Sequence, residues 1–177
     1  ILSAPVMIDL DFKPVEFRCT RTEVGISFAT YRFTAVDRPV VVRPVTGATV
    51  TVDANYVCRC FSIDNADAVV EGLCIRRGRT TANNSCNGNG VLFGANGGTL
   101  RNCTVELCQG GIGSKGNGVY LSGGALVTGC TIRNCQANAN GTEYGIGAYL
   151  AKGTLERCLV TGCTRTGFKD SQPADGA

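Results

Sequence analysis

A nine-residue phrase recurs along this chain at nearly constant spacing. It has apolar residues at its first and sixth positions and Cys at its fourth and ninth, in copies at residues 100–108, 127–135 and 155–163. A looser copy at 70–78 has Leu73 and Gly78 where the others have Cys. The fourth positions, 73, 103, 130 and 158, are 30, 27 and 28 residues apart. Such a period predicts a solenoid, in which each unit buries its apolar face against its neighbours.

A second pattern precedes each phrase and indicates strands. The triplets 61–63, 91–93, 119–121 and 148–150 have apolar outer residues and a variable middle residue. This alternation has the period of a β-strand, and no segment shows the longer three-and-four spacing of a helix. Short strands, turns rich in Gly and Asn, and a repeat just under thirty residues favour a parallel β-helix.

Composition and length fit one all-β domain over residues 1–177. Hydrophobic residues make up 44% of the chain and charged residues only 18%, as expected for a well-buried protein. We divide the domain into N-terminal strands and first coils at 1–56, regular repeats at 57–163, and the start of a further loop or coil at 164–177. Alternation from Val6 to Phe12 predicts an initial coil or an edge hairpin. No cap follows Cys163, so we expect a fragment of a longer solenoid.

Three segments carry a resemblance to a known group of proteins. Residues 39–43, 47–52 and 60–75 resemble the opening coils of the right-handed parallel β-helix superfamily, which includes pectate-lyase-like enzymes and bacterial surface adhesins. The resemblance implies a single-domain right-handed parallel β-helix in a secreted or cell-surface bacterial protein. It is specific for the fold and not for an activity, because one fold hosts many functions.

The chain has eleven Cys and no His, which raises the question of a metal array. A tetrahedral site needs ligands that converge on one point, whereas the repeats place Cys in rows along the solenoid axis. We therefore predict no metal site and two structural ladders in the core: Cys103, Cys130 and Cys158 in one, and Cys108, Cys135 and Cys163 in the other. Most of these thiols are expected to be reduced. Cys58, Cys60, Cys74 and Cys86 are better placed for irregular cross-links.

Alignment of the repeats also predicts columns of outward side chains. Arg76, Glu106, Arg133 and Thr161 form one column, in which alternating charges favour an ion-pair ladder. Ser62, Leu92, Tyr120 and Tyr149 form another, in which the two Tyr rings can stack on each other or on a sugar. Loops at 79–90, 109–118 and 136–147 emerge at one corner and carry Lys115. The candidate ligand-binding residues are Tyr120, Tyr149, Arg76, Arg133 and Lys115.

These residues leave two functional hypotheses and no assigned catalytic residue. Without His, Ser-His-Asp and Cys-His nucleophiles are excluded. Asp64 and Asp67 lie in a predicted turn, where Asp commonly bonds nearby backbone. The first hypothesis is a non-catalytic structural or binding segment that presents stacked loops to a glycan or another macromolecule. The alternative is a pectate-lyase-like polysaccharide lyase acting on acidic polysaccharide, and only this alternative would use Ca2+.

Other partners are not indicated. A net charge of +3 is too small and dispersed to predict nucleic-acid binding. No run of apolar residues is long enough to predict a membrane span.

Overall fold

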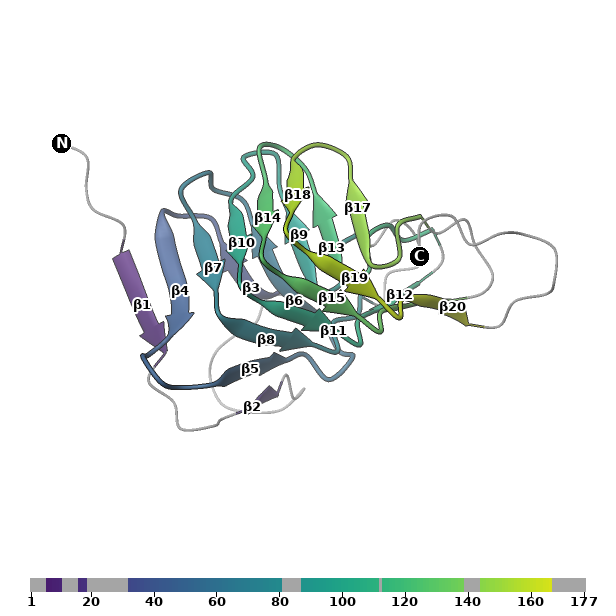
Figure 1. Cartoon of the computed structure of the whole chain (residues 1–177), viewed down its shortest axis with the longest axis horizontal. Coiled ribbons are helices and arrows are strands. Elements are labelled where there is room, and N and C mark those ends of the chain that lie inside the picture. The colour runs from purple at the N-terminus through teal and green to yellow at the C-terminus, as the bar shows by residue number, and fades with distance from the viewer. Residues whose placement is uncertain are drawn as a thin grey trace.

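The computed structural model describes residues 6–10, 16–18, 32–80, 87–111, 113–138 and 144–166. All regular structure in these residues is strand, and the strands form four parallel sheets, A to D (Figure 1). The sheets stack as a β-solenoid of about four turns. The predicted all-β parallel β-helix is therefore confirmed.

Each sheet takes one strand from each successive coil. Sheet A contains β1 (Val6–Leu10), β4 (Val40–Pro44), β7 (Val69–Glu71), β10 (Thr99–Arg101), β14 (Leu126–Thr128) and β18 (Thr154–Glu156). Sheet B contains β2 (Glu16–Arg18), β5 (Val50–Asp53), β8 (Leu73–Arg76), β11 (Thr104–Glu106), β15 (Thr131–Arg133) and β19 (Leu159–Thr161). Sheet C contains β3 (Arg32–Val36), β6 (Arg59–Ile63), β9 (Val91–Phe93), β13 (Val119–Leu121) and β17 (Ala148–Leu150). The small sheet D contains β12 (Gln109–Gly110), β16 (Gln136–Asn138) and β20 (Thr164–Thr166).

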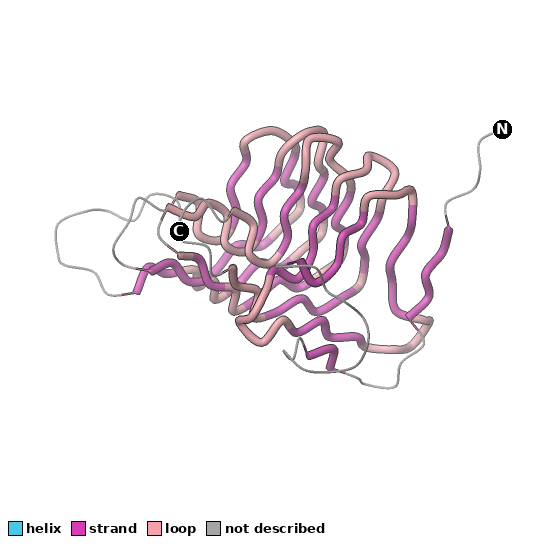
Figure 2. Tube along the Cα trace, turned by 180° about the vertical axis from the view of Figure 1, so that it is seen from behind, coloured by secondary structure: helices cyan, strands magenta, loops and turns pink. Residues whose placement is uncertain are grey.

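Equivalent positions of successive coils are paired in register. A regular coil passes through sheets C, A and B and, from the coil of β9 onward, through the short sheet D before the loop to the next coil. Figure 2 shows the strands and the loops that join them from behind. Val105 pairs with Ile75 on one side and Ile132 on the other. The repeat alignment made from the sequence is therefore the alignment of the structure.

The N-terminal alternating segment is an initial coil. Strand β1 runs parallel to β4, from Val6 opposite Val40 to Leu10 opposite Pro44, and β2 runs parallel to β5. An edge hairpin would need antiparallel neighbours. Of the two predicted alternatives, the coil is correct.

Two left-handed corners explain the nine-residue phrase. One residue with positive φ lies between the strand of sheet A and the strand of sheet B, directly before the fourth position of the phrase. A second residue with positive φ follows the strand of sheet B, directly before the ninth position. Cys occupies both positions in the later copies. The first corner is Gly72, Asn102, Gly129 or Arg157, and the second is Arg77, Leu107, Asn134 or Gly162, with φ between 51° and 68°. Gly and Asn suit this conformation, whereas other residues adopt it at a cost of roughly 1–2 kcal/mol.

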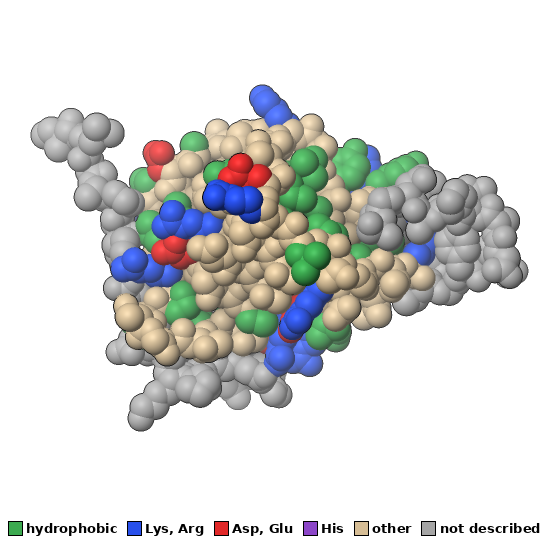
Figure 3. All heavy atoms as spheres, viewed as in Figure 1, with side chains coloured by type: hydrophobic (Ala, Val, Ile, Leu, Met, Phe, Trp, Pro, Cys, Tyr) green, Lys and Arg blue, Asp and Glu red, His purple; other side chains and the backbone are tan. Residues whose placement is uncertain are grey.

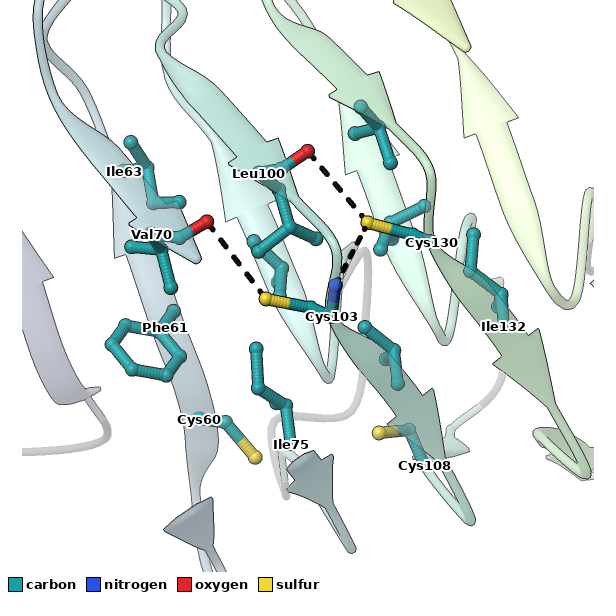
Figure 4. Packing of buried hydrophobic residues seen from close by; sticks show 14 of the residues in the cluster. Cys60, Phe61, Ile63, Val70, Ile75, Leu100, Cys103, Cys108, Cys130 and Ile132 are labelled. Atoms are coloured by element: carbon teal, nitrogen blue, oxygen red, sulfur yellow. Dashed lines mark hydrogen bonds between the residues drawn. The ribbon is translucent and has the colours of Figure 1, made fainter. Parts of the chain in front are cut away.

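The inward residues of sheets A, B and C form one continuous core (Figure 4). Those that are at most 1% exposed include Ile63, Phe93 and Leu121 from sheet C, Val70, Leu100 and Val127 from sheet A, and Ile75, Val105 and Ile132 from sheet B. Each stacks on its equivalent in the next coil. The core is therefore a set of parallel columns, and burial of apolar surface is shared by all coils.

The first cysteine ladder fastens neighbouring coils at the corner between sheets A and B. Cys103 and Cys130 are each 2% exposed. The backbone N–H of Cys103 donates to Cys130 Sγ at 3.4 Å, and the Cys130 thiol donates to the carbonyl of Leu100 at 3.7 Å (Figure 4). Cys158 accepts from Cys130 N–H in the same way. The prediction that Cys158 lies in the core like its two equivalents is wrong: it is only half-buried, because it lies on the outermost coil that the structure describes.

The second ladder depends on a glycine across the coil from each sulfur. Cys108 and Cys135 are fully buried, and Cys163 is nearly so. A Cβ added to Gly90 would lie 2.9 Å from Cys108 Sγ, and one added to Gly147 would lie 3.0 Å from Cys163 Sγ. These glycines leave the space that the sulfur fills.

In the first coil of this ladder, the Cys and Gly of each such pair exchange positions. Cys60 stands at the position of Gly90, and Gly78 stands at the position of Cys108. The Cys60 thiol donates to the carbonyl of Arg76 at 3.3 Å, just as that of Cys108 donates to the equivalent Glu106 carbonyl at 3.4 Å. The same space is therefore filled by sulfur from the opposite side of the coil.

No cross-link joins the described cysteines. None of the nine is in a disulfide, and these nine include Cys58, Cys60 and Cys74, so the cross-links expected at these three positions are not present. Cys60 instead packs inside the core as part of the second ladder, where it is fully buried. Cys19 and Cys86 lie outside the described residues.

Substitution of Gly118 tests the paired glycine and cysteine positions. A Cβ there would lie 2.4 Å from the carbonyl oxygen of Gly147 and 2.7 Å from Ile132 Cγ2. We expect Gly118→Ala to lower the free energy of unfolding by about 1–3 kcal/mol, as overpacked core substitutions do. Urea denaturation followed by circular dichroism measures this change. Gly124→Ala is the matched control, because nothing lies within 4 Å of its added Cβ; equal effects of the two substitutions would contradict the packing argument.

Candidate functional site

The loops between sheets B and C hold Lys115 firmly by its backbone. Its N–H donates to Asn87 Oδ1 at 3.0 Å, and its carbonyl accepts from the N–H of Gly88 at 3.0 Å. On the other side it forms an isolated parallel bridge with Tyr144 of the next coil. The main chain of Lys115 is thus fixed between two coils, and only its side chain is free to move.

Buried amides stiffen this corner from within. Asn89 and Asn117 are fully buried. Asn89 Nδ2 donates to Asn117 Oδ1 at 3.2 Å, and Asn117 Nδ2 donates to the carbonyl of Gln136 at 2.8 Å. The recurring Asn-Gly-Val at 89–91 and 117–119 is the sequence signal for this ladder.

Tyr120 and Tyr149 stack on the outer face of sheet C. They are direct register partners on β13 and β17. Their ring centroids lie 5.4 Å apart, and the ring planes differ by 8°. Both side chains are partly exposed. The predicted column is confirmed, with Tyr120 opposite Leu92 and Leu92 opposite Ser62, although Ser62 is only 8% exposed.

The Lys115 ammonium group lies against two tyrosine rings. Its Nζ lies 5.1 Å from the ring centroid of Tyr149 and 5.7 Å from that of Tyr144, which is 41% exposed. The structure therefore brings together three of the predicted residues, Lys115, Tyr120 and Tyr149, and adds Tyr144. We call these four residues the tyrosine–lysine cluster. Tyr144 could have been found by aligning Lys115-Gly-Asn-Gly-Val with Tyr144-Gly-Ile-Gly-Ala, instead of aligning the loops from their first residues.

Arg76 and Arg133 lie apart from this cluster, on sheet B. The predicted column is in register, because Glu106 pairs with Arg76 on β8 and with Arg133 on β15. Arg133 forms an ion pair with Glu106 at 2.6 Å. Figure 3 shows the outer surface over sheets A and B, where basic and acidic side chains lie next to one another. Mixed charges of this kind are typical of a solvated structural surface.

Asp53 extends the column and holds Arg76. Its side chain is fully buried, and Arg76 Nε donates to Oδ2 at 2.8 Å. Arg77 Nε and the N–H of Asn55 donate to Oδ1 at 2.8 and 2.9 Å. Burial alone would raise the pKa of Asp53, but these hydrogen bonds outweigh it and lower the pKa below its ordinary value. Arg76 is therefore a structural partner of Asp53.

Of the two aspartates of the predicted turn, Asp64 makes a structural contact with its side chain, whereas Asp67 is exposed and bonds through its backbone. The backbone N–H of Asp67 donates to Asn65 Oδ1 at 3.0 Å. Asp64 Oδ1 accepts from the N–H of Asn96 on the next coil at 2.9 Å. Asp64 thus links two coils, whereas we had expected it to bond its own turn.

The ladder thiols differ in acidity. Hydrogen bonding to Cys108 and burial raise the pKa of Cys135 well above its ordinary value. In the other ladder, hydrogen bonding from the Cys103 thiol lowers the pKa of Cys130 to about 7, while that of Cys103 is raised. In the described part of the chain, no group of three or more His, Cys, Asp or Glu residues is arranged to hold a metal ion.

Comparisons with known proteins add no family. No family model, curated protein or solved structure matches the chain. Among the described residues, no helix is long and apolar enough to cross a membrane.

The Asp53 contacts predict acid sensitivity. Because folding lowers the pKa of Asp53, its carboxylate stabilises the fold at pH values above the unfolded-state pKa, and this stability is lost as the pH falls through the folded-state pKa. We therefore expect the urea concentration at the midpoint of unfolding to decrease as the pH is lowered from 7 to 3. We expect Asp53→Asn to lose roughly 3–5 kcal/mol at pH 7, because it removes the buried carboxylate that Arg76 and Arg77 bond, and to show a smaller pH dependence. An unchanged pH dependence in Asp53→Asn would contradict this assignment.

Proposed function

We propose that this chain is a non-catalytic binding segment of a β-solenoid, presenting its tyrosine–lysine cluster to a glycan or another macromolecule. The observation that supports the proposal is the stacking of Tyr120 on Tyr149, with the Lys115 ammonium over the Tyr149 ring. Aromatic rings provide apolar contact area with few rotatable bonds, and the lysine ammonium provides three hydrogen-bond donors.

Rigidity favours this site over the other outward columns. Tyr120 and Tyr149 are carried on paired strands, and the backbone of Lys115 is hydrogen-bonded to the preceding coil. A site that is already ordered loses little conformational entropy on binding. The charged side chains of sheet B, in contrast, are engaged with one another, as Arg133 is with Glu106.

The wider assignment follows the resemblance given by the opening coils. We place the segment in a secreted or cell-surface bacterial protein of the pectate-lyase-like superfamily. The parallel solenoid is consistent with this placement. Free thiols are more typical of reducing compartments, and here most of the described thiols are protected from oxidants by burial.

A polysaccharide lyase is the second candidate. Lyases of the resembled superfamily abstract a proton with Lys, Arg or Tyr, and the tyrosine–lysine cluster brings two of these residue types together. Such an enzyme would release unsaturated uronate products that absorb ultraviolet light. Incubation with acidic polysaccharides, with and without Ca2+, tests for these products, and their release would replace the binding proposal with the lyase.

Binding measurements with tyrosine variants test the first proposal. We expect the chain to bind at least one member of a panel of neutral and acidic polysaccharides in affinity electrophoresis. Tyr149→Ala should weaken that binding at least tenfold, which corresponds to about 1.4 kcal/mol, because it removes one ring of the stack.

Leu92→Ala is the matched control for this experiment. Leu92 lies in the same outward column, next to Tyr120, and has no aromatic ring. Equal losses in Leu92→Ala and Tyr149→Ala, or no binding to any polysaccharide or protein partner, would contradict the proposal.

A further inference from the structure

Lys115 differs from the arginines of the outer columns in what surrounds its charge. Arg133 is paired with Glu106, and Arg101 is paired with Glu71. Lys115 has no acidic group within ion-pair distance among the described residues, and its Nζ lies over the rings of Tyr144 and Tyr149. Within the part of the chain that the structure describes, its ammonium group therefore packs against aromatic surface and has no carboxylate partner.

The position of this ammonium group has a consequence for any ligand that stacks on the tyrosines. A cation over the rings of Tyr144 and Tyr149 occupies space that a ligand ring would need. A neutral ligand has to displace the ammonium group and has no negative charge with which to pair it. An anionic ligand displaces it and then accepts a charge-assisted hydrogen bond from it, which is stronger than a neutral one.

We infer that Lys115 determines the ligand class of this site by covering the tyrosines in the free protein and pairing with an anionic group of the ligand in the complex. The inference rests on the proposed binding function and names its ligand: a molecule with an apolar ring face and a carboxylate or sulfate beside it. Only the lysine side chain has to move. Its backbone is held by Asn87 and Gly88, while its stem is long and flexible.

The cover over the rings can be observed without any ligand. Aromatic rings shift the resonances of protons above their faces upfield. We expect the ε-methylene protons of Lys115 to resonate upfield of the other lysines in the free protein and to move toward the ordinary position in Tyr149→Ala. An ordinary position in the unsubstituted chain would overturn the inference.

Ligand selection is tested with two matched probes, a cello-oligosaccharide and its C6-oxidised counterpart, which carries carboxylates on the same sugar backbone. We expect the unsubstituted chain to bind the oxidised probe at least tenfold more tightly at low salt, with the preference declining as salt is added. Lys115→Met keeps an unbranched side chain of nearly the same length without its charge. It should abolish the preference and bind the neutral probe as well as, or better than, the unsubstituted chain does.

The outcomes separate this inference from the function on which it rests. If Tyr149→Ala weakens both probes but Lys115→Met keeps the preference for the oxidised one, the site is a binding site and the inference about Lys115 is wrong. If Tyr149→Ala has no effect on either probe, or if neither probe binds the unsubstituted chain, both proposals are overturned for glycans. Urea denaturation of Lys115→Met confirms that any change in binding is not a loss of fold.

Discussion

The whole structure depends on the way in which each coil is bonded only to the coils above and below it. Strand hydrogen bonds, corner hydrogen bonds and core contacts all run along the axis, as in the pairing of Val105 with Ile75 and Ile132. Such stacking requires every coil to enclose nearly the same volume. The left-handed corners keep the coils congruent, and the inward columns of Val, Leu and Ile fill them. Side chains on the outside of the coil are less constrained, so the outer columns vary in polarity and charge while the inner columns keep small or apolar residues.

Much of this fold could be predicted because repetition amplifies weak local signals. The strand triplets and the two cysteine ladders were each visible in several copies. Two errors at the ladders have physical causes. Full burial of Cys158 was inferred from its equivalents, but burial depends on a covering coil and not on the residue. Cys60 was assigned to cross-linking because its glycine partner, Gly78, lies 18 positions further on, and only the folded coil brings the two positions together.

The candidate site was harder to predict because it joins elements that repeat differently. Tyr120 and Tyr149 belong to regular strands and could be paired from the sequence. Lys115 and Tyr144 lie in loops of unequal length, from Gln109 to Gly118 and from Gln136 to Gly147, so their bridge becomes visible only when the loops are aligned from their ends. Asp53 was missed for a similar reason. It lies before the first copy of the phrase, and its arginine partners are on the next coil.

The reversed pair Cys60 and Gly78 also limits how a chain of this kind can change by duplication or recombination. In the coil that begins at Cys60, sulfur enters the shared space from the first half of the coil, whereas in the coils with Cys108, Cys135 and Cys163 it enters from the second half. A crossover inside a coil that joined the two kinds would leave that space with two sulfurs or with none, and so either overpack the core or leave a cavity. Exchange of whole coils avoids both outcomes. An exchange that preserves the packing of this core therefore has to include the complete coil and not the nine-residue phrase alone.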